Sequence, residues 1–184
     1  MGTASRRVAF LIAMALLPTI AGCTPEASPA PEVVPAATTN FGGTDLAWIE
    51  ISIAMNDQVL PLLALVSTRG DDAALTKLSA DVEATATAEL STLHSLHDQA
   101  GLPAENPHEG MPMPGLVPPE EVTRVAGLSG PSFDRAVIEQ LEGYLEQSHR
   151  LAEQELTSGT DPQTRDLATR TATARATALR QLTA

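Results

Sequence analysis

Hydrophobic residues after position 43 recur every three or four residues, which is the spacing of one face of an α-helix. Residues 44–70 carry one such stripe, made of Leu46, Ile49, Ile53, Leu60 and Leu63. Residues 71–101 carry a second, made of Leu75, Leu78, Val82, Leu90, Leu93 and Leu96. Each segment ends at a glycine, as helices often do. The pattern predicts a helical hairpin over 44–101, with a kink or break at Pro61 in its first helix.

The second half of the chain repeats the first at a constant offset of 89 residues. The pairs that match are Asp45 with Asp134, Gly70 with Gly159, Asp72 with Asp161, Leu78 with Leu167, Leu90 with Leu179, and Leu93 with Leu182. This repeat predicts a second hairpin over 131–184, whose last helix is poor in large apolar residues. The linker 102–130 is rich in Pro and Gly, and its stretch PPEEVTRVAG predicts one short helix.

Two hairpins of this kind bury their apolar stripes against each other. The sequence therefore predicts an all-α fold, a four-helix bundle over residues 44–184 made of hairpins 44–101 and 131–184. One core suits a segment of this length.

The N-terminus has the pattern of a bacterial lipoprotein signal. Arg6 and Arg7 precede a short apolar run, and Ile20-Ala21-Gly22-Cys23 resembles a lipobox, in which the cysteine is acylated after cleavage. The cysteine at this place is the single cysteine of the chain. We predict a signal peptide over 1–22, a lipid anchor on Cys23, and attachment to the lipid bilayer at the extracytoplasmic face of the cell membrane.

Residues 23–43 are rich in Pro, Ala, Ser and Thr, which predicts a disordered tether between the lipid anchor and the helices. The formal charge of the chain is −12. So acidic a protein is not expected to bind nucleic acid. The sequence names no protein partner.

Two sets of side chains could bind a metal ion. His108, Met111 and Met113 lie in the Pro-rich linker, and imidazole and thioether ligands together favour Cu(I). His94 and His97 are three residues apart near the end of the second helix and could share a metal with them. The alternatives are a linker that packs through its methionines, and exposed histidines near a helix C-terminus.

The chain from 44 to 184 resembles the domain-of-unknown-function-305 family. The stretches that carry the resemblance are TDLAWIEISIAM, LPLLALVSTRGDD, GLPAENPHEGMPMPGLVPPEEV, GPSFDRAVIEQL and AEQELTSGTDPQTRDLA. The resemblance implies a ferritin-like bundle related to copper-binding periplasmic proteins of the CopM type.

The chain departs from this family at the family's metal positions. Family members usually carry a His-His pair in the first helix of each hairpin, and the aligned pairs here are Met55-Asn56 and Tyr144-Leu145. A Gln and a Glu are usual in each second helix, and only Glu89 remains, while Arg175 aligns with a Gln. The resemblance thus implies a divergent member that has lost its metal site. We expect an interior held by packing alone, with the carboxylate of Glu89 in water at its edge.

Three functions follow as hypotheses. The first is a non-enzymatic, membrane-anchored lipoprotein with a degenerate metal-binding bundle, acting as an interaction or structural module with no cofactor. The second is a copper-binding protein that uses the Met/His set of the linker. The third, a ferritin-like oxidoreductase, lacks the carboxylates that a di-iron site needs.

Overall fold

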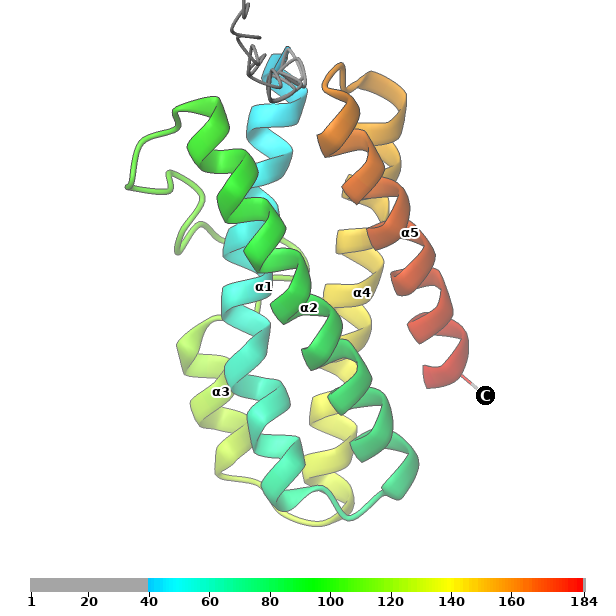
Figure 1. Ribbon diagram of the computed structural model, residues 1–184. Coiled ribbons are helices and arrows are strands. Elements are labelled where there is room, and N and C mark those ends of the chain that lie inside the picture. The colour runs from blue at the N-terminus through cyan, green and yellow to red at the C-terminus, as the bar shows by residue number, and fades with distance from the viewer. Residues whose placement is uncertain (1–39, 184) are drawn as a thin grey trace, which may run out of the picture. The chain divides into compact units, whose positions relative to one another are not determined.

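The computed structural model describes residues 40–183, which form five α-helices and no strand (Figure 1). These helices are α1 (Gly43–Arg69), α2 (Ala73–Ala100), α3 (Pro119–Ala126), α4 (Pro131–Ser158) and α5 (Pro162–Leu182). The predicted all-α fold is confirmed. The predicted signal peptide 1–22, Cys23 and most of the predicted tether 23–43 lie outside the described residues.

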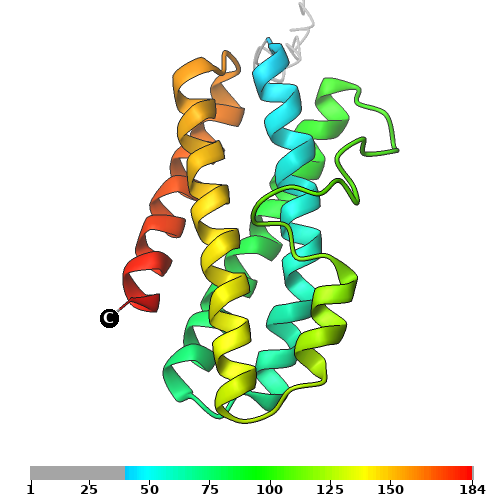
Figure 2. The same ribbon diagram turned by 180° about the vertical axis from the view of Figure 1, so that it is seen from behind.

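Four long helices pack as two antiparallel hairpins (Figures 1 and 2). The closest pairings are α1 with α2 and α4 with α5, and the hairpins meet where α1 packs on α4 and α2 on α5. The short α3 lies in the linker and packs against α1 and α4. The hairpin α1–α2 spans residues 43–100 and the hairpin α4–α5 spans residues 131–182.

The repeat is visible in how the hairpins turn. Asp72 and Asp161 each cap the second helix of a hairpin, and the carboxylate of each accepts hydrogen bonds from two backbone N–H groups of the first turn. Gly70 and Gly159 each end the preceding helix in an extended conformation, and each donates its N–H to a carbonyl four residues back. The same local chemistry therefore builds both turns.

The helix α1 continues through Pro61, so of the predicted kink or break the break is wrong. Pro61 is exposed, while its neighbours Leu62 and Leu63 are fully buried. Burial of these leucines stabilises the helix enough to offset the hydrogen bond that proline cannot donate. Among the described residues, α1 is the one helix long and apolar enough to cross a bilayer, yet much of it is core.

The core consists of two apolar clusters. One contains Trp48, Ile49 and Leu93 and lies toward the start of α1. The other contains Val59 and Leu141, and α3 packs over it. A set of hydrogen-bonded polar side chains from the four long helices also lies in the interior. These residues are Asn56 of α1, Glu89 of α2, Tyr144 and Ser148 of α4, and Thr171 and Arg175 of α5. We call this set the polar layer.

Candidate functional site: a buried polar layer

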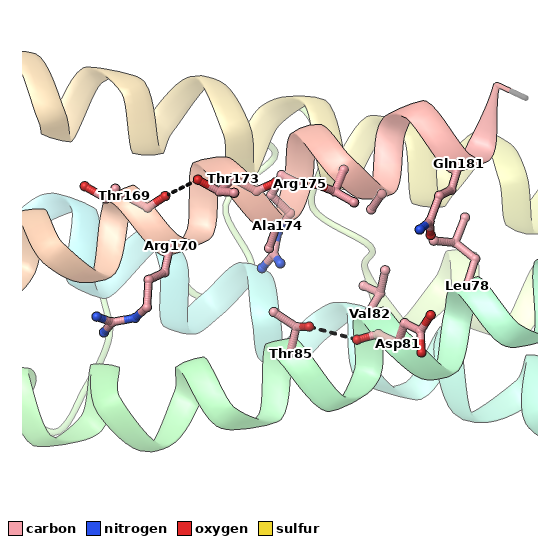
Figure 3. Close-up of a pocket in the computed structure, with 12 residues that line it drawn as sticks. Leu78, Asp81, Val82, Thr85, Thr169, Arg170, Thr173, Ala174, Arg175 and Gln181 are labelled. Carbon is pink, nitrogen blue, oxygen red and sulfur yellow. Dashed lines mark hydrogen bonds between the residues drawn. The ribbon is translucent and has the colours of Figure 1, made fainter.

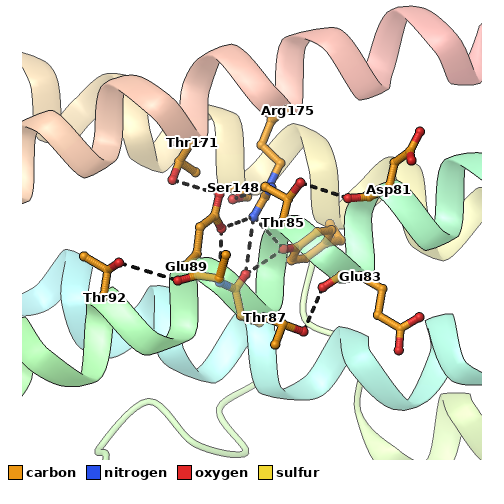
Figure 4. A network of polar contacts seen from close by, with 12 residues as sticks. Asp81, Glu83, Thr85, Thr87, Glu89, Thr92, Ser148, Thr171 and Arg175 are labelled. Atoms are coloured by element: carbon orange, nitrogen blue, oxygen red, sulfur yellow. Dashed lines mark hydrogen bonds and ion pairs between the residues drawn. The ribbon is translucent and has the colours of Figure 1, made fainter.

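The polar layer is centred on Arg175, whose side chain is 1% exposed (Figure 4). Its Nη2 lies 2.5 Å from Oε2 of Glu89 and 2.7 Å from the hydroxyl of Tyr144. Its Nε donates to the hydroxyl of Ser148 at 3.1 Å. The guanidinium also stacks over the ring of Tyr144, with 5.1 Å between its central carbon and the ring centroid. One cation thus contacts groups from α2 and α4 at once.

The remaining members complete the network around the carboxylate of Glu89. Thr171 donates to its Oε1 and Asn56 donates to its Oε2, each at 3.2 Å. The hydroxyl of Tyr144 donates to Oδ1 of Asn56 at 2.6 Å. Each of the four long helices therefore contributes at least one hydrogen-bonding side chain to the layer.

Burial sets the protonation state of Tyr144. Desolvation raises the pKa of its hydroxyl far above the usual value, and the nearby charge of Arg175 offsets this only in part. The hydroxyl stays protonated in any physiological solution, so it can donate to Asn56 while it accepts from Arg175. Glu89 and Arg175 compensate each other's charge, as buried ions must.

Helix periodicity explains why these residues meet. Tyr144 and Ser148 are four residues apart on α4, and Thr171 and Arg175 are four apart on α5, so each pair shares one helix face. The side chains of Ser148, Arg175 and Glu89 point toward one another between the helices (Figure 4). Asn56 reaches the same group through its hydrogen bonds with Glu89 and Tyr144.

Two predictions about this region are wrong. The carboxylate of Glu89 is buried and paired, with 5% of the residue exposed, and does not lie in water. The interior is held by hydrogen bonds and an ion pair as well as by packing. The signal in the sequence is Arg175 itself, a charged residue at an inward position of the helical repeat.

The predicted ligands of the linker lie on the outside of α1. Nε2 of His108 is 3.8 Å from Oε2 of Glu50, and Asn106 donates from Nδ2 to the carbonyl of Glu50 at 2.7 Å. These contacts fold the linker onto α1. Met113 packs against the core, and Met111 is exposed. The two methionines line one pocket with Gln58 and linker prolines, and His108 does not line it.

The two predicted histidines of α2 differ in exposure. His94 is exposed and close to Asp57, the pKa of which is raised by burial and by Glu109 and lowered by His94. His97 is half-buried, with Nδ1 3.8 Å from a carboxylate oxygen of Asp98. Within residues 40–183, no three side chains of His, Cys, Asp or Glu are grouped so that they could hold a metal ion.

A groove of about 480 Å³ runs between α2 and α5 beside the polar layer (Figure 3). Arg175 lines it, together with Leu78 and Val82 of α2 and with small side chains of α5 such as Ala174 and Ala178. The scarcity of large apolar residues on α5, noted in the sequence, leaves this space unfilled.

The fold has close parallels among solved structures. One is a crystal structure of a DUF305 fragment from Deinococcus radiodurans, with a TM-score of 0.67, 14% identity, and coverage of 78% of this chain and 95% of that one. Another is a predicted secreted DUF305 protein from Streptomyces coelicolor, with a TM-score of 0.67, 17% identity, and coverage of 76% and 89%. At such identities the likeness shows the fold. Among curated proteins, none is significantly similar to this chain.

The described residues 40–183, which we call the helical unit, therefore belong to an all-α class of protein with known structural relatives. The model of the family described as Domain of unknown function (DUF305) matches residues 45–184. The chain belongs to this family, as the resemblance in its sequence predicted.

Proposed function

We propose that this protein is a metal-independent four-helix bundle of the ferritin-like kind. It serves as a non-enzymatic interaction or structural module, lipid-anchored at the extracytoplasmic face of the cell membrane. The observation that carries this proposal is the position of Arg175. Its guanidinium supplies the positive charge in the polar layer, where the family resemblance aligns metal ligands in other members.

A guanidinium can replace a metal ion in this setting for a physical reason. It is a permanent cation with several donors, and it compensates the carboxylate of Glu89 while it binds Tyr144 and Ser148. A divalent ion at the same place would meet the positive charge of Arg175. The layer is therefore complete without a metal and unfavourable to one.

Thermal unfolding of residues 40–184, with and without a strong chelator, tests the proposal. We expect the same midpoint in both conditions, and no stoichiometric metal by elemental analysis of the purified protein. A midpoint that falls on chelation, or one tightly held metal ion per chain, would overturn the metal-independent function.

The alternative function is soft-metal binding, with Cu(I) held by the linker. Its support is that Met111 and Met113 line one pocket, close in sequence to His108. Competition with a chromophoric Cu(I) chelator tests it on residues 40–184, which exclude Cys23. A single tight site that is lost in a His108/Met111/Met113 triple Ala variant would favour copper binding. A further loss with His94→Ala and His97→Ala would add these residues to the site.

A further inference from the structure

Two acidic side chains are fully buried at the end of the helical unit where α1 begins. Asp45 lies in the first turn of α1 and Glu155 in the last turn of α4, and both are 0% exposed. Asp45 accepts a hydrogen bond from the backbone N–H of Thr160, and Oε1 of Glu155 lies against Gly159, the residue before Thr160, so the two carboxyl groups are close neighbours. Two ionised carboxylates in contact inside a protein repel each other strongly, so the pair must share a proton.

The hydrogen bonds show which residue is ionised. Asp45 accepts from the backbone N–H of Gly42 at 2.6 Å and from those of Thr160 and Asp161 at 3.0 Å. Burial alone would raise the pKa of Asp45, but these bonds and the neighbouring carboxyl of Glu155 hold it at about 2. Asp45 is therefore the carboxylate.

Glu155 is the group that keeps the proton. Neither of its oxygens accepts a hydrogen bond from any described N–H or O–H group. Burial raises the pKa of Glu155 to about 8, helped by the neighbouring carboxylate of Asp45 and by the charge of Asp161, while Arg165 acts against the shift. Arg165 is the one basic group among these, and it also donates to the carbonyl of Leu156.

The pair connects parts of the chain that are far apart in sequence. Asp45 holds the turn between α4 and α5 through Thr160 and Asp161, and Thr160 in turn donates its hydroxyl to the carbonyl of Asn40. The segment before α1 is thereby fixed to the α4–α5 turn at the end where the helical unit joins the preceding residues.

We propose that Asp45 and Glu155 form a pH-sensitive latch, which fixes the start of α1 to the α4–α5 turn in acidic solution and loosens as the pH rises. Loosening is the transfer of one proton from the Glu155 carboxyl to hydroxide, which yields a second carboxylate and water. Both oxygens of Glu155 are shielded from solvent, so the proton leaves when the start of α1 opens toward the pocket of about 340 Å³ that Gly43, Trp48 and Glu155 line. Repulsion from Asp45 and Asp161 then separates α1 from the turn.

Hydrogen–deuterium exchange of the full chain between pH 5 and 9 tests the latch. The amides to follow are those of Gly42, Thr160 and Asp161, because they donate to Asp45. After correction for intrinsic exchange, we expect their protection to fall about tenfold per pH unit up to about pH 8 and to level off above it. In Glu155→Gln the amide replaces the protonated carboxyl, and protection should not depend on pH.

Glu142→Gln is the matched control, because Glu142 is exposed on the same helix. It should keep the pH profile of the unchanged chain. Protection that is flat in the unchanged chain, or a slope that persists in Glu155→Gln, would overturn the latch. If Glu155→Gln does not fold, a carboxyl ¹³C titration of Glu155 in the unchanged chain decides. An inflection near pH 8 supports the latch, and one near the usual value for glutamate overturns it.

Discussion

Arg175 compensates the charge of Glu89 in the polar layer, so the stability of the interior depends on it. Replacement of a buried ion pair by apolar groups can be neutral, but removal of one partner leaves an uncompensated charge. Both partners of this pair, Glu89 and Arg175, are almost fully buried. The free energy of unfolding should therefore respond very differently to single and double substitutions at these two positions.

We predict that Arg175→Met lowers the free energy of unfolding by about 3–5 kcal/mol, because Glu89 is left buried without its cation. The double variant Glu89→Leu/Arg175→Met should recover most of this loss. Urea unfolding of the three proteins measures both effects. Arg170→Met, at an exposed position, should change stability by only about 0.5 kcal/mol. Equal stability of Arg175→Met and Arg170→Met would contradict the role given to the layer.

The raised pKa of Glu155 makes a second prediction, about stability and pH. Between pH 4.5 and about 8, the unfolded chain has lost this proton and the folded chain keeps it, so stability should fall as pH rises through that interval. Asp45 acts in the opposite sense, and its contribution is lost only as pH falls from about 4 toward 2. Denaturant titrations from pH 4 to 9 should show the decline in the unchanged chain and a flatter profile in Glu155→Gln.

At the scale of the helix, the ends of the hairpins could be read from the sequence and the polar layer could not. Asp72 and Asp161 act within their own first turn, so a local pattern is enough to place them. Whether Arg175 points inward depends on how α5 is rotated against α2 and α4. The many Ala and Thr residues of α5 form no strong apolar face, so the sequence does not predict this rotation. The meeting of Asp45 with the α4–α5 turn is likewise tertiary.

Two glycines, Gly43 at the start of α1 and Gly159 at the end of α4, differ in how much space surrounds them. A Cβ on Gly159 would collide with the side chain of Glu155, while a Cβ on Gly43 would meet nothing. We predict that Gly159→Ala lowers the free energy of unfolding by about 1–3 kcal/mol, which thermal unfolding detects as a lower midpoint. Gly43→Ala should be neutral or stabilising by about 0.5–1 kcal/mol. Two variants of similar stability would show that Glu155 can move aside without cost.

At the scale of the whole molecule, the fold and family are known for the described helices, and the location in the cell is predicted from the residues before them. The family of the helical unit is shown by the match over residues 45–184. The predicted location depends on the lipobox pattern around Cys23. The interaction hypothesis depends on this location, because an anchored module meets its partners at the membrane surface.

The anchor makes the last prediction. In a bacterial host that acylates lipoproteins, the full chain should sediment with membranes, and Cys23→Ala should leave it in the soluble or secreted fraction. One acyl chain binds a bilayer only weakly, whereas two or three bind stably, so the difference should be nearly complete. Mass spectrometry of the N-terminal peptide should find acyl chains on Cys23. If Cys23→Ala stayed with the membrane to the same extent, attachment would have to come from an uncleaved N-terminal segment, and the lipid anchor would be wrong.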